Sequence, residues 1–294
     1  MKTVAIIGAG RVGGSVGRLL AKAGYRVTAV ASRGREHAEQ ARSFIGSGTV
    51  ITDPVEAAFS AEVVFITTPD GSIRNVCDAI VAGGGFRQGT VVVHMSGAQT
   101  LGLLDAAKKA GAHRAVIHPL QSIPSMELGE KNIHGSYFRV DADPAAVQTA
   151  RELVMALGGI ELKMPKWSSD KGSAALYHAG AVVVSNFFVA LVDFGLRYYQ
   201  ALGASKEDAL KAVLPLIKGT LSNIESAGIP DALTGPIMRG DVETVKGHLQ
   251  AMSERAPELL PLYRELARHT VMVAQDKDSI NPQTAADIQK LMEH

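Results

Sequence analysis

Residues 4–13 of the chain read VAIIGAGRVG, and the fold can be inferred outward from this stretch. Four apolar residues suited to a buried strand lead into a Gly-x-Gly-x-x-Gly turn, and a helical pattern follows. Gly8 permits the tight turn, Gly10 lets the backbone approach a pyrophosphate, and Gly13 lets the helix pack closely against the strand. The free N–H groups at the positive end of that helix would then bind the phosphates. The stretch predicts a dinucleotide-binding loop, the alternative being a glycine-rich turn without ligand. The predicted loop residues are Gly8, Gly10, Arg11, Val12 and Gly13.

Beyond the loop, short apolar runs alternate with amphipathic stretches as far as about residue 163. This alternation is typical of parallel strands joined by crossover helices, so we predict an α/β fold with a Rossmann-like doubly wound parallel sheet. The predicted strands are Val4–Ile7, Val27–Val30, Val50–Ile51, Val63–Thr67, Val91–His94, Ala115–Ile117, Tyr137–Val140 and Ile160–Leu162. The predicted helices are Val12–Ala23, Gly34–Ile45, Ile73–Ala82, Leu101–Ala110 and Ala145–Leu157.

After Pro165 the sequence contains helical patterns and no convincing strand. Ser205 with Asp208 resembles a capping box, and we expect Asp241 and Thr284 to be N-caps. A chain of 294 residues is long enough for two domains at roughly 150 residues each. We predict a dinucleotide-binding domain over residues 1–164, followed by an all-helical domain for substrate binding and dimerisation over residues 165–294.

Composition excludes several classes of protein. Thirty Lys and Arg residues against 29 Asp and Glu residues leave a net charge of +1, so no basic field exists to bind nucleic acid or an anionic membrane. The single cysteine, Cys77, excludes an internal disulfide and a cysteine-rich metal site, and we predict no metal. The first residues lack the layout of a signal peptide, so we expect a cytoplasmic protein.

The segment Gly172–Val192 contains no charged residue, and an uncharged segment of this length is a candidate membrane span. Tyr177, His178, Ser185 and Asn186 lie in its middle, where hydrocarbon would disfavour them. We interpret the segment instead as a helix buried in a soluble domain or in a subunit interface. Because about 130 residues cannot bury so much apolar surface alone, we predict a homodimer formed through the helical domain.

Side chains at the end of the second strand predict which dinucleotide binds. An NAD enzyme places Asp or Glu here against the ribose hydroxyls, whereas this chain has Ser32 and Arg33. These residues can hydrogen-bond a 2′-phosphate and neutralise its charge, which favours NADP(H). Alternatively, Arg33 and the nearby Arg35 are solvated surface charges. After the fourth strand, Thr68 and Pro69 are expected to form a ledge for the nicotinamide ribose.

Two further strand ends carry side chains suited to chemistry. Ser96 follows the fifth strand and His118 ends the sixth, so both are expected at the cofactor edge of the sheet. A histidine exchanges protons near neutral pH, with an ordinary pKa of about 6.5, and a serine can hydrogen-bond a reacting oxygen or nitrogen. The alternative is that His118 only braces its loop.

The charge-free helix offers a second set of polar groups. His178, Ser185 and Asn186 fall on one side of an otherwise apolar helix, where they could line a small-molecule pocket. They could equally form a buried polar stripe satisfied by neighbouring helices or by a second subunit. Arg239, in a turn before the helix capped by Asp241, could bind a substrate carboxylate or pair with an acid.

Together these motifs resemble a bacterial family of NADP oxidoreductases that join a Rossmann-like domain to a helical C-terminal domain of unknown function. The motifs are Gly8–Gly13, Thr68-Pro69-Asp70, His94-Met95-Ser96-Gly97, 118–122, 177–181 with Ser185-Asn186, and 235–241. The chain is similar, more distantly, to the 6-phosphogluconate dehydrogenase-like superfamily, which includes pyrroline-5-carboxylate reductase, ketopantoate reductase and prephenate dehydrogenase. In prephenate dehydrogenases a Ser and a His-Pro in these places act on the substrate hydroxyl, which implies such roles for Ser96 and His118. Ketopantoate reductase has a catalytic Lys followed by Asn on the corresponding helix, whereas here His178 stands near the Lys position and Asn186 follows, so the resemblance does not imply a lysine mechanism.

We therefore predict an NADP(H)-dependent oxidoreductase that transfers hydride to or from a small carbonyl, imine or alcohol in a cleft between the domains. Its predicted catalytic residues are His118, Ser96, His178 and Asn186. One alternative is an NADP(H)-binding sensor or scaffold without turnover. Another, which the resemblance suggests, is a reductase that transfers hydride between NADP and a deazaflavin.

Overall fold

The computed structural model describes residues 2–293. Contacts between residues divide the chain into two compact units, the first ending at Ser185 and the second beginning at Asn186. This division follows spatial contacts, whereas the predicted domain limits follow a change in composition. Those limits, at residues 164 and 165, stay a prediction.

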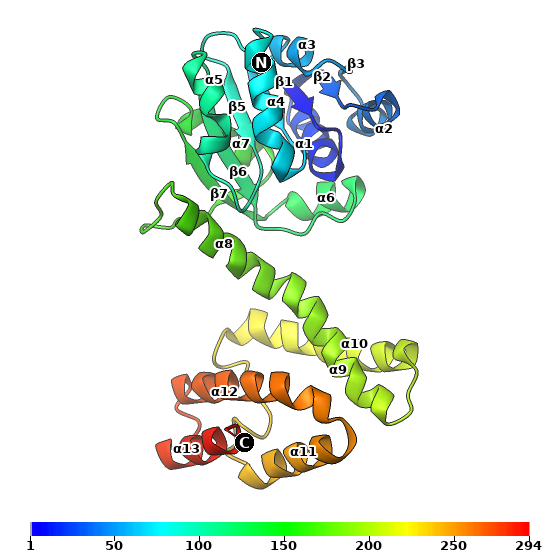
Figure 1. Cartoon of the computed structure of the whole chain (residues 1–294), viewed down its shortest axis with the longest axis vertical. Coiled ribbons are helices and arrows are strands. Elements are labelled where there is room, and N and C mark those ends of the chain that lie inside the picture. Colours follow the sequence, from blue (N-terminus) through cyan, green and yellow to red (C-terminus); the bar gives the residue numbers. More distant parts are fainter. Residues whose placement is uncertain (1, 294) are drawn as a thin grey trace. The chain divides into compact units, whose positions relative to one another are not determined.

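The first unit is built on an eight-stranded sheet with the strand order β3-β2-β1-β4-β5-β6-β7-β8 (Figure 1). The strands are β1 Thr3–Ile7, β2 Arg26–Ala31, β3 Thr49–Ile51, β4 Val63–Ile66, β5 Val91–His94, β6 His113–Pro119, β7 Tyr137–Ala142 and β8 Ile160–Glu161. All eight predicted strands are thereby confirmed, and so is the Rossmann-like fold class. The order reverses direction between β1 and β4, which is where ligands bind in doubly wound sheets.

One pair of strands departs from the predicted parallel arrangement. β7 runs antiparallel to β6, with His118 opposite Arg139. The connecting segment carries α6, Met126–Ile133, which packs against α1, Arg11–Lys22. Because this segment does not cross the sheet, the chain re-enters beside β6 from the same edge and must run in the opposite direction.

Helices cover both faces of the sheet. One apolar layer joins residues such as Ile6 and Phe65 to α1, α2, α6 and α7, and the other joins Ala5 and Val64 to α3, α4 and α5. Burial on both faces explains why the strands read as continuous apolar runs. The remaining helices of this unit are α2 Arg35–Ile45, α3 Pro54–Phe59, α4 Asp70–Ala82, the 3-10 helix η1 Leu101–Leu104, α5 Asp105–Lys109, α7 Val147–Ala156 and α8 Lys171–Val184. Two helices of this unit, α3 and α6, have no counterpart among the predicted helices, because they are too short to show a clear helical period.

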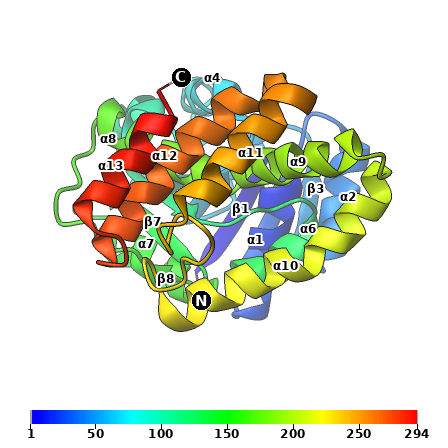
Figure 2. The same ribbon diagram turned by 90° about the horizontal axis from the view of Figure 1, so that it is seen from below.

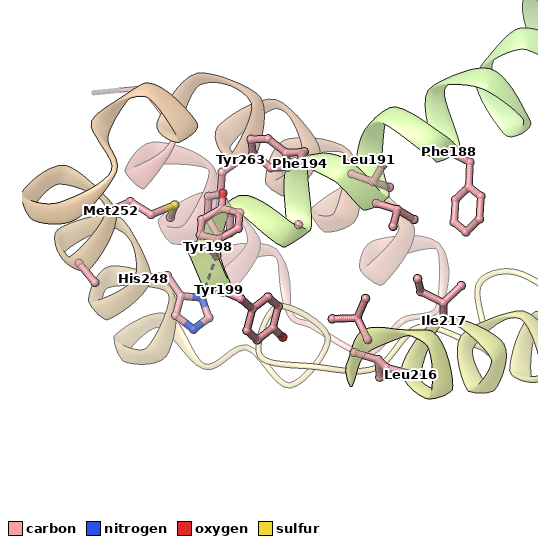
Figure 3. A pocket seen from close by; sticks show the side chains of 14 residues that line it. Phe188, Leu191, Phe194, Tyr198, Tyr199, Leu216, Ile217, His248, Met252 and Tyr263 are labelled. Atoms are coloured by element: carbon pink, nitrogen blue, oxygen red, sulfur yellow. Dashed lines mark hydrogen bonds between the residues drawn. The ribbon is translucent and has the colours of Figure 1, made fainter. Parts of the chain in front are cut away.

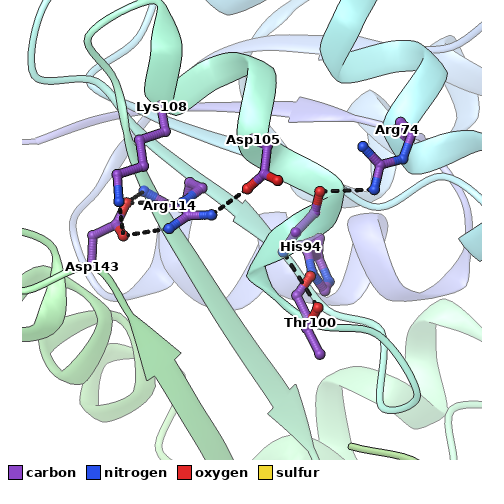
Figure 4. A network of polar contacts seen from close by, with 8 residues as sticks. Arg74, His94, Thr100, Asp105, Lys108, Arg114 and Asp143 are labelled. Atoms are coloured by element: carbon purple, nitrogen blue, oxygen red, sulfur yellow. Dashed lines mark hydrogen bonds and ion pairs between the residues drawn. The ribbon is translucent and has the colours of Figure 1, made fainter. Parts of the chain in front are cut away.

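An ion-pair cluster joins the amino end of β6 to α5 and to Asp143, which follows β7 (Figure 4). Arg114 donates two side-chain hydrogen bonds to Asp143, at 3.1 and 2.8 Å, and pairs with Asp105 on α5. Lys108 lies 3.7 Å from the same Asp143 carboxylate. Burial alone would raise the pKa of Asp143, but the hydrogen bonds from Arg114 outweigh it and lower that pKa.

The charge-free segment is not one uninterrupted helix. α8 ends at Val184, Ser185 interrupts the helical pattern, and α9 begins at Asn186. The stretch Lys171–Ala201 is long and apolar enough to cross a membrane by length and composition alone, and 6% of its most apolar window is buried. Leu176 is 78% exposed and Val184 is 73% exposed. The interpretation as a helix buried within its own domain is therefore wrong.

The second unit is all-helical over its described residues, which confirms that part of the predicted fold (Figure 2). Its helices are α9 Asn186–Ala201, α10 Lys206–Ala227, α11 Val242–Arg255, η2 Pro257–Leu259, α12 Leu260–Asp276 and α13 Pro282–Leu291. α11, α12 and α13 pack together around a core that includes Val245, Val271 and Ile288.

Helix starts in this unit agree with the sequence in two of three cases. Ser205 accepts a hydrogen bond from the Asp208 N–H at 3.1 Å, and Asp241 caps α11, as predicted. Thr284 is not an N-cap. The cap is Asn281, which accepts a hydrogen bond from the Thr284 N–H at 2.8 Å, because Pro282 takes the first helical position.

Candidate functional site

The predicted phosphate-binding loop lies between the carboxyl ends of β1 and β4. The Thr67 N–H donates to the Ile7 carbonyl at 2.8 Å, and the Thr67 hydroxyl donates to the Gly8 carbonyl at 2.8 Å. Gly8 has φ of +111°, and a Cβ there would lie 2.6 Å from the Thr67 carbonyl carbon. A Cβ at Gly13 would collide with the Gly8 carbonyl, whereas a Cβ at Gly10 would meet nothing within 4 Å. The first and third glycines are thus needed for packing, and the second faces open space.

A cavity of about 420 Å³ opens at this loop. Seven of the nine predicted cofactor-binding residues line it, namely Gly8, Gly10, Arg11, Ser32, Arg33, Thr68 and Pro69. Val12 instead lines a smaller cavity of about 80 Å³, which shares Thr67 and Thr68 with the larger one and is also lined by Asp70 and Ser96. Gly13 lies in the packing contact beneath the loop. Sequence reasoning missed His37, Gln40 and Met126, which also line the larger cavity.

The chemistry of this cavity suits a dinucleotide phosphate. The N-cap of α1 is Gly10, which has no side chain to satisfy the first N–H groups, and the first turn holds no acid. The Thr68 hydroxyl is buried and has no hydrogen-bond partner among the described residues. The end of β2 offers Ser32 and Arg33 and no carboxylate. These groups are the ones that would hold NADP(H).

Met126 reaches the cavity because several residues near the start of α1 have small side chains or none. Gly14 has no side chain, so Met126 can lie against it, and a Cβ at Gly14 would collide with the Met126 sulfur. The Ser15 hydroxyl is 2.9 Å from the Met126 carbonyl and serves as its donor. The signal in the sequence is the run of small residues after Gly13, which permits a second helix to approach.

Ser96 is positioned by two neighbours. Its hydroxyl donates to the Asp70 carboxylate at 2.5 Å, and its N–H donates to His94 Nδ1 at 3.2 Å. His94 Nε2 lies 3.0 Å from the Thr100 carbonyl and must therefore carry the proton (Figure 4). Burial lowers the pKa of His94 to about 4, so this histidine is neutral and braces the loop. The Ser96 oxygen keeps a lone pair with which it can accept a hydrogen bond.

His118 and His178 meet at Gly97. A Cβ on Gly97 would lie 2.7 Å from His118 Nε2 and 2.8 Å from His178 Nδ1, so only glycine fits between the rings. The ring centroids of the two histidines are 6.3 Å apart. His178 Nδ1 is buried and lacks a partner among the described residues. The structure thus brings Ser96, His118 and His178 around one loop, and their catalytic roles stay a prediction.

Tyr177 is a member of this cluster to which the sequence analysis assigns no role. Its hydroxyl lies 2.9 Å from His118 Nδ1, and the two rings meet edge to face. Burial raises the pKa of Tyr177 to about 12. The signal that could have identified it is its place beside His178 on the polar side of α8.

Arg139 on β7 is the second missed residue. It is 0% exposed, and it donates to the carbonyls of Ser96, Gly97 and Gln99 at 3.2, 3.0 and 2.7 Å. Its guanidinium carbon lies 4.9 Å from the Trp167 ring centroid and 5.4 Å from that of Tyr177. An arginine within an apolar strand is the sequence signal, because such a charge is rarely buried without a function or a partner.

The electrostatics of the cluster alter what is expected of His118. Burial lowers the pKa of His118 to about 3, with further lowering by Arg139, His178 and His94. The imidazole is therefore neutral at neutral pH, and a group titrating near 6.5 is not expected from it. A neutral imidazole can still accept one hydrogen bond and donate another.

Two predicted polar residues make none of the contacts described for this cluster. Ser185 is exposed at the end of α8, and Asn186 is exposed as the first residue of α9 in the second unit. Asn186 as a substrate-orienting residue therefore stays a prediction. Arg239 forms no ion pair within residues 2–293, so contact with a substrate carboxylate stays a prediction for it.

Two family models match the chain, one in each half. Residues 1–119 match the Rossmann-like domain, and residues 136–270 match a domain of unknown function, DUF2520. No curated protein matches the sequence.

Solved structures share the fold along nearly the whole chain. A Thermotoga maritima protein is 25% identical with a TM-score of 0.70, over 94% of this chain and 99% of that one. A "putative NADP oxidoreductase" from Bacteroides fragilis is 21% identical with a TM-score of 0.69, over 92% and 97%. A reductive aminase from Aspergillus terreus, solved with NADPH, is 14% identical with a TM-score of 0.61, over 99% of each chain. At these identities the last two establish a common fold.

Proposed function

We propose that this protein, whose chain joins a Rossmann-like domain to a DUF2520 domain, is an NADP(H)-dependent oxidoreductase acting on a small carbonyl, imine or alcohol. The observation that carries the proposal is the small cavity beside the phosphate-binding loop. It is lined both by Thr68, at the dinucleotide cavity, and by Ser96, in the loop that touches His118 and His178. Reductase names among proteins of the same fold support the reaction class.

The cofactor's phosphates would be held by the residues of the larger cavity. The N–H groups at the start of α1 would bind the pyrophosphate, and Ser32 and Arg33 would bind the 2′-phosphate. Bound NADPH supplies a hydride to an electrophilic carbon. The chain's own residues must then position the substrate and provide a proton for its oxygen or nitrogen.

The His118–Tyr177 pair is suited to hold that proton. Both groups are uncharged at neutral pH, and they share a hydrogen bond of 2.9 Å. If His118 donates from Nδ1, the Tyr177 hydroxyl is free to donate to the substrate, and solvent restores the proton afterwards. Ser96 accepts a hydrogen bond, while His178 orients the substrate.

Binding measurements test the choice of cofactor. We expect NADPH to bind more tightly than NADH, and Arg33→Ala to weaken NADPH binding about 10-fold or more, because a charge-assisted hydrogen bond contributes about 1.5–3 kcal/mol. Arg35→Ala is the matched control, since Arg35 pairs with Glu39 at 2.9 Å on the surface and does not line the cavity. Calorimetry in which NADH binds more tightly would reject NADP(H).

Turnover tests the reaction. A panel of small aldehydes, ketones, imines and alcohols is assayed with NADPH or NADP, using His118→Asn and the control His113→Asn at the other end of β6. We expect loss of about 100-fold or more in the first variant only, which is a typical contribution of proton transfer. Cofactor binding with no turnover across the panel would favour the sensor alternative.

We also propose that a second copy of the chain covers the exposed apolar face of the second unit. A groove of about 680 Å³ lies between α9, α10, α11 and α12 and is lined mainly by aromatic and aliphatic side chains (Figure 3). Tyr177 and His178 contact His118 in the first unit, so the start of the apolar stretch cannot lie in a bilayer. Sedimentation at several concentrations should give a dimer, and a monomer throughout would contradict it.

A further inference from the structure

Arg139 is a buried cation that has no carboxylate bonded to it. Its side chain is 0% exposed, and no ion pair to it exists within the described residues. The nearest acid on its own strand, Asp141, accepts a hydrogen bond from the Ser169 hydroxyl at 2.6 Å instead. Asp141 influences Arg139 only through space, by raising its pKa against the lowering caused by burial. Buried charges are normally paired, so this arrangement requires an explanation.

Arg139 contacts the loop and the aromatic residues around the candidate site. Its terminal nitrogens donate to three carbonyls of the loop 96–99, which are the carbonyls of Ser96, Gly97 and Gln99. The guanidinium carbon lies over the rings of Trp167 and Tyr177. The first set of contacts holds the loop that touches both histidines, and the second holds the tyrosine that bonds to His118.

We propose that Arg139 is the positioning residue of this site, holding Gly97 against His118 and His178 and holding Tyr177 in hydrogen-bond range of His118. This inference rests on the function proposed above. A lysine could not replace it, because one ammonium group cannot bond these three carbonyls in the fork geometry of a guanidinium and also lie over both rings. The carbonyls and the ring faces compensate the positive charge of Arg139 only in part. The electric field of this charge therefore reaches His118.

The charged and titratable groups around His118 support the second half of this role. They are Arg139 on β7, His94 on β5, and Tyr177 and His178 on α8. Arg139 is the group among them that stays charged at every physiological pH. Its field adds to burial in lowering the pKa of His118, which keeps the imidazole neutral and able to share a proton with Tyr177 in either direction.

Three variants separate geometry from charge. Arg139→Gln removes the charge, Arg139→Lys keeps it without the fork, and Gly97→Ala leaves Arg139 intact but crowds both histidines. Histidine-labelled NMR reports the protonation of His118 and the hydrogen bond at its Nδ1, while calorimetry reports NADPH binding. Both readouts are independent of turnover.

In the wild type, His118 should not titrate between pH 5 and 8. We expect its pKa to rise in Arg139→Gln and to stay low in Arg139→Lys. All three variants should lose the ordered Nδ1 signal, and turnover should fall about 100-fold in kcat, as expected for a misplaced catalytic group. NADPH binding should be unchanged, because the residues that line its cavity are different.

A folded Arg139→Gln with wild-type His118 titration and an unchanged Nδ1 signal would overturn the proposal. If that variant does not fold, Trp167→Leu removes one stacking partner while keeping the charge and the carbonyl bonds. An unchanged Nδ1 signal in both Trp167→Leu and Gly97→Ala would then overturn it. Absence of turnover in the wild type would refute the proposed function but would leave the NMR result valid.

Discussion

Arg114 and Arg139 lie on adjacent strands, and the chain treats their charges in opposite ways. Arg114, near the amino end of β6, is bonded to Asp143 and Asp105 and forms part of an ion-pair cluster (Figure 4). Arg139, on β7 opposite His118, is bonded to carbonyls and lies over aromatic rings. The first charge is cancelled locally and serves stability. The charge of Arg139 has no carboxylate partner among the described residues, and it adds to burial in lowering the pKa of His118.

The difference shows why the place of a charge in a fold matters more than the residue type. Doubly wound sheets bind ligands beyond the carboxyl ends of their strands, so a field is useful at that edge and only costly at the other. The predictions below test whether the two arginines really divide stability and function between them.

The largest effect is expected on removing the partner of Arg114. Asp143→Ala leaves that guanidinium, whose side chain is 13% exposed, without its main acid, and the free energy of unfolding should fall by about 3 kcal/mol. Asp105→Ala is the control, because Asp105 is 53% exposed and such pairs contribute about 1 kcal/mol or less. Urea unfolding measures both variants. An equal loss in the two would break the comparison, and NADPH binding should not change in either.

Acid should weaken the two regions in separate pH ranges. The pKa values of folded His118 and His94, about 3 and about 4, lie below the ordinary 6.5. Above about pH 6.5 both histidines are neutral in the folded and the unfolded protein, and the full stability is present. As pH falls below about 6.5 towards the folded pKa values, the unfolded state takes up protons first, so the free energy of unfolding falls by about 2 kcal/mol per histidine by pH 5. The lowered pKa of Asp143 contributes stability above its unfolded value of about 3.9, and that is lost only as pH falls further.

Urea unfolding at pH 7, 5 and 3 separates these ranges. His118→Asn should lose less stability than the wild type between pH 7 and 5, whereas Asp143→Asn should differ from it mainly by losing less below pH 4. The same pH dependence in His118→Asn and the wild type between pH 7 and 5 would contradict the assignment to the histidine.

The smallest effect is expected from the aromatic contacts. Trp167→Leu removes a ring that lies 4.9 Å from the buried Arg139 and should cost about 1–2 kcal/mol. Phe59→Leu is the surface control, because Arg87 lies 5.6 Å from the centroid of a ring that is 56% exposed and contributes about 0.5 kcal/mol. Equal losses in thermal unfolding would show that burial does not strengthen the Arg139 contact.

Local patterns in the sequence predicted the elements well where a short range of residues decides them. All strand positions could be read from apolar runs, and the capping residues Ser205 and Asp241 from their side chains. The error at Thr284 arose where two caps compete three residues apart, and Pro282 settles the choice. α6 was not predicted because eight residues show little helical period, although it brings Met126 to the cavity at the glycine-rich loop.

The candidate site was predicted in part for the same reason. Ser96 and His118 follow strands, so the edge of the sheet to which they belong is known from the sequence alone. Arg139 and Tyr177 could not be placed, because the first depends on β7 running antiparallel beside β6 and the second on how α8 packs against that edge.

By itself the sequence determined the glycine-rich turn after β1, the succession of the strands and the change to an all-helical second half. These depend on backbone freedom at glycine and on apolar periodicity, both of which act over a few residues. Only the tertiary structure decided that β7 is antiparallel, that Gly97 separates two histidines and that His118 is neutral. These depend on desolvation and on contacts between residues far apart in the chain, and no local pattern records such contacts.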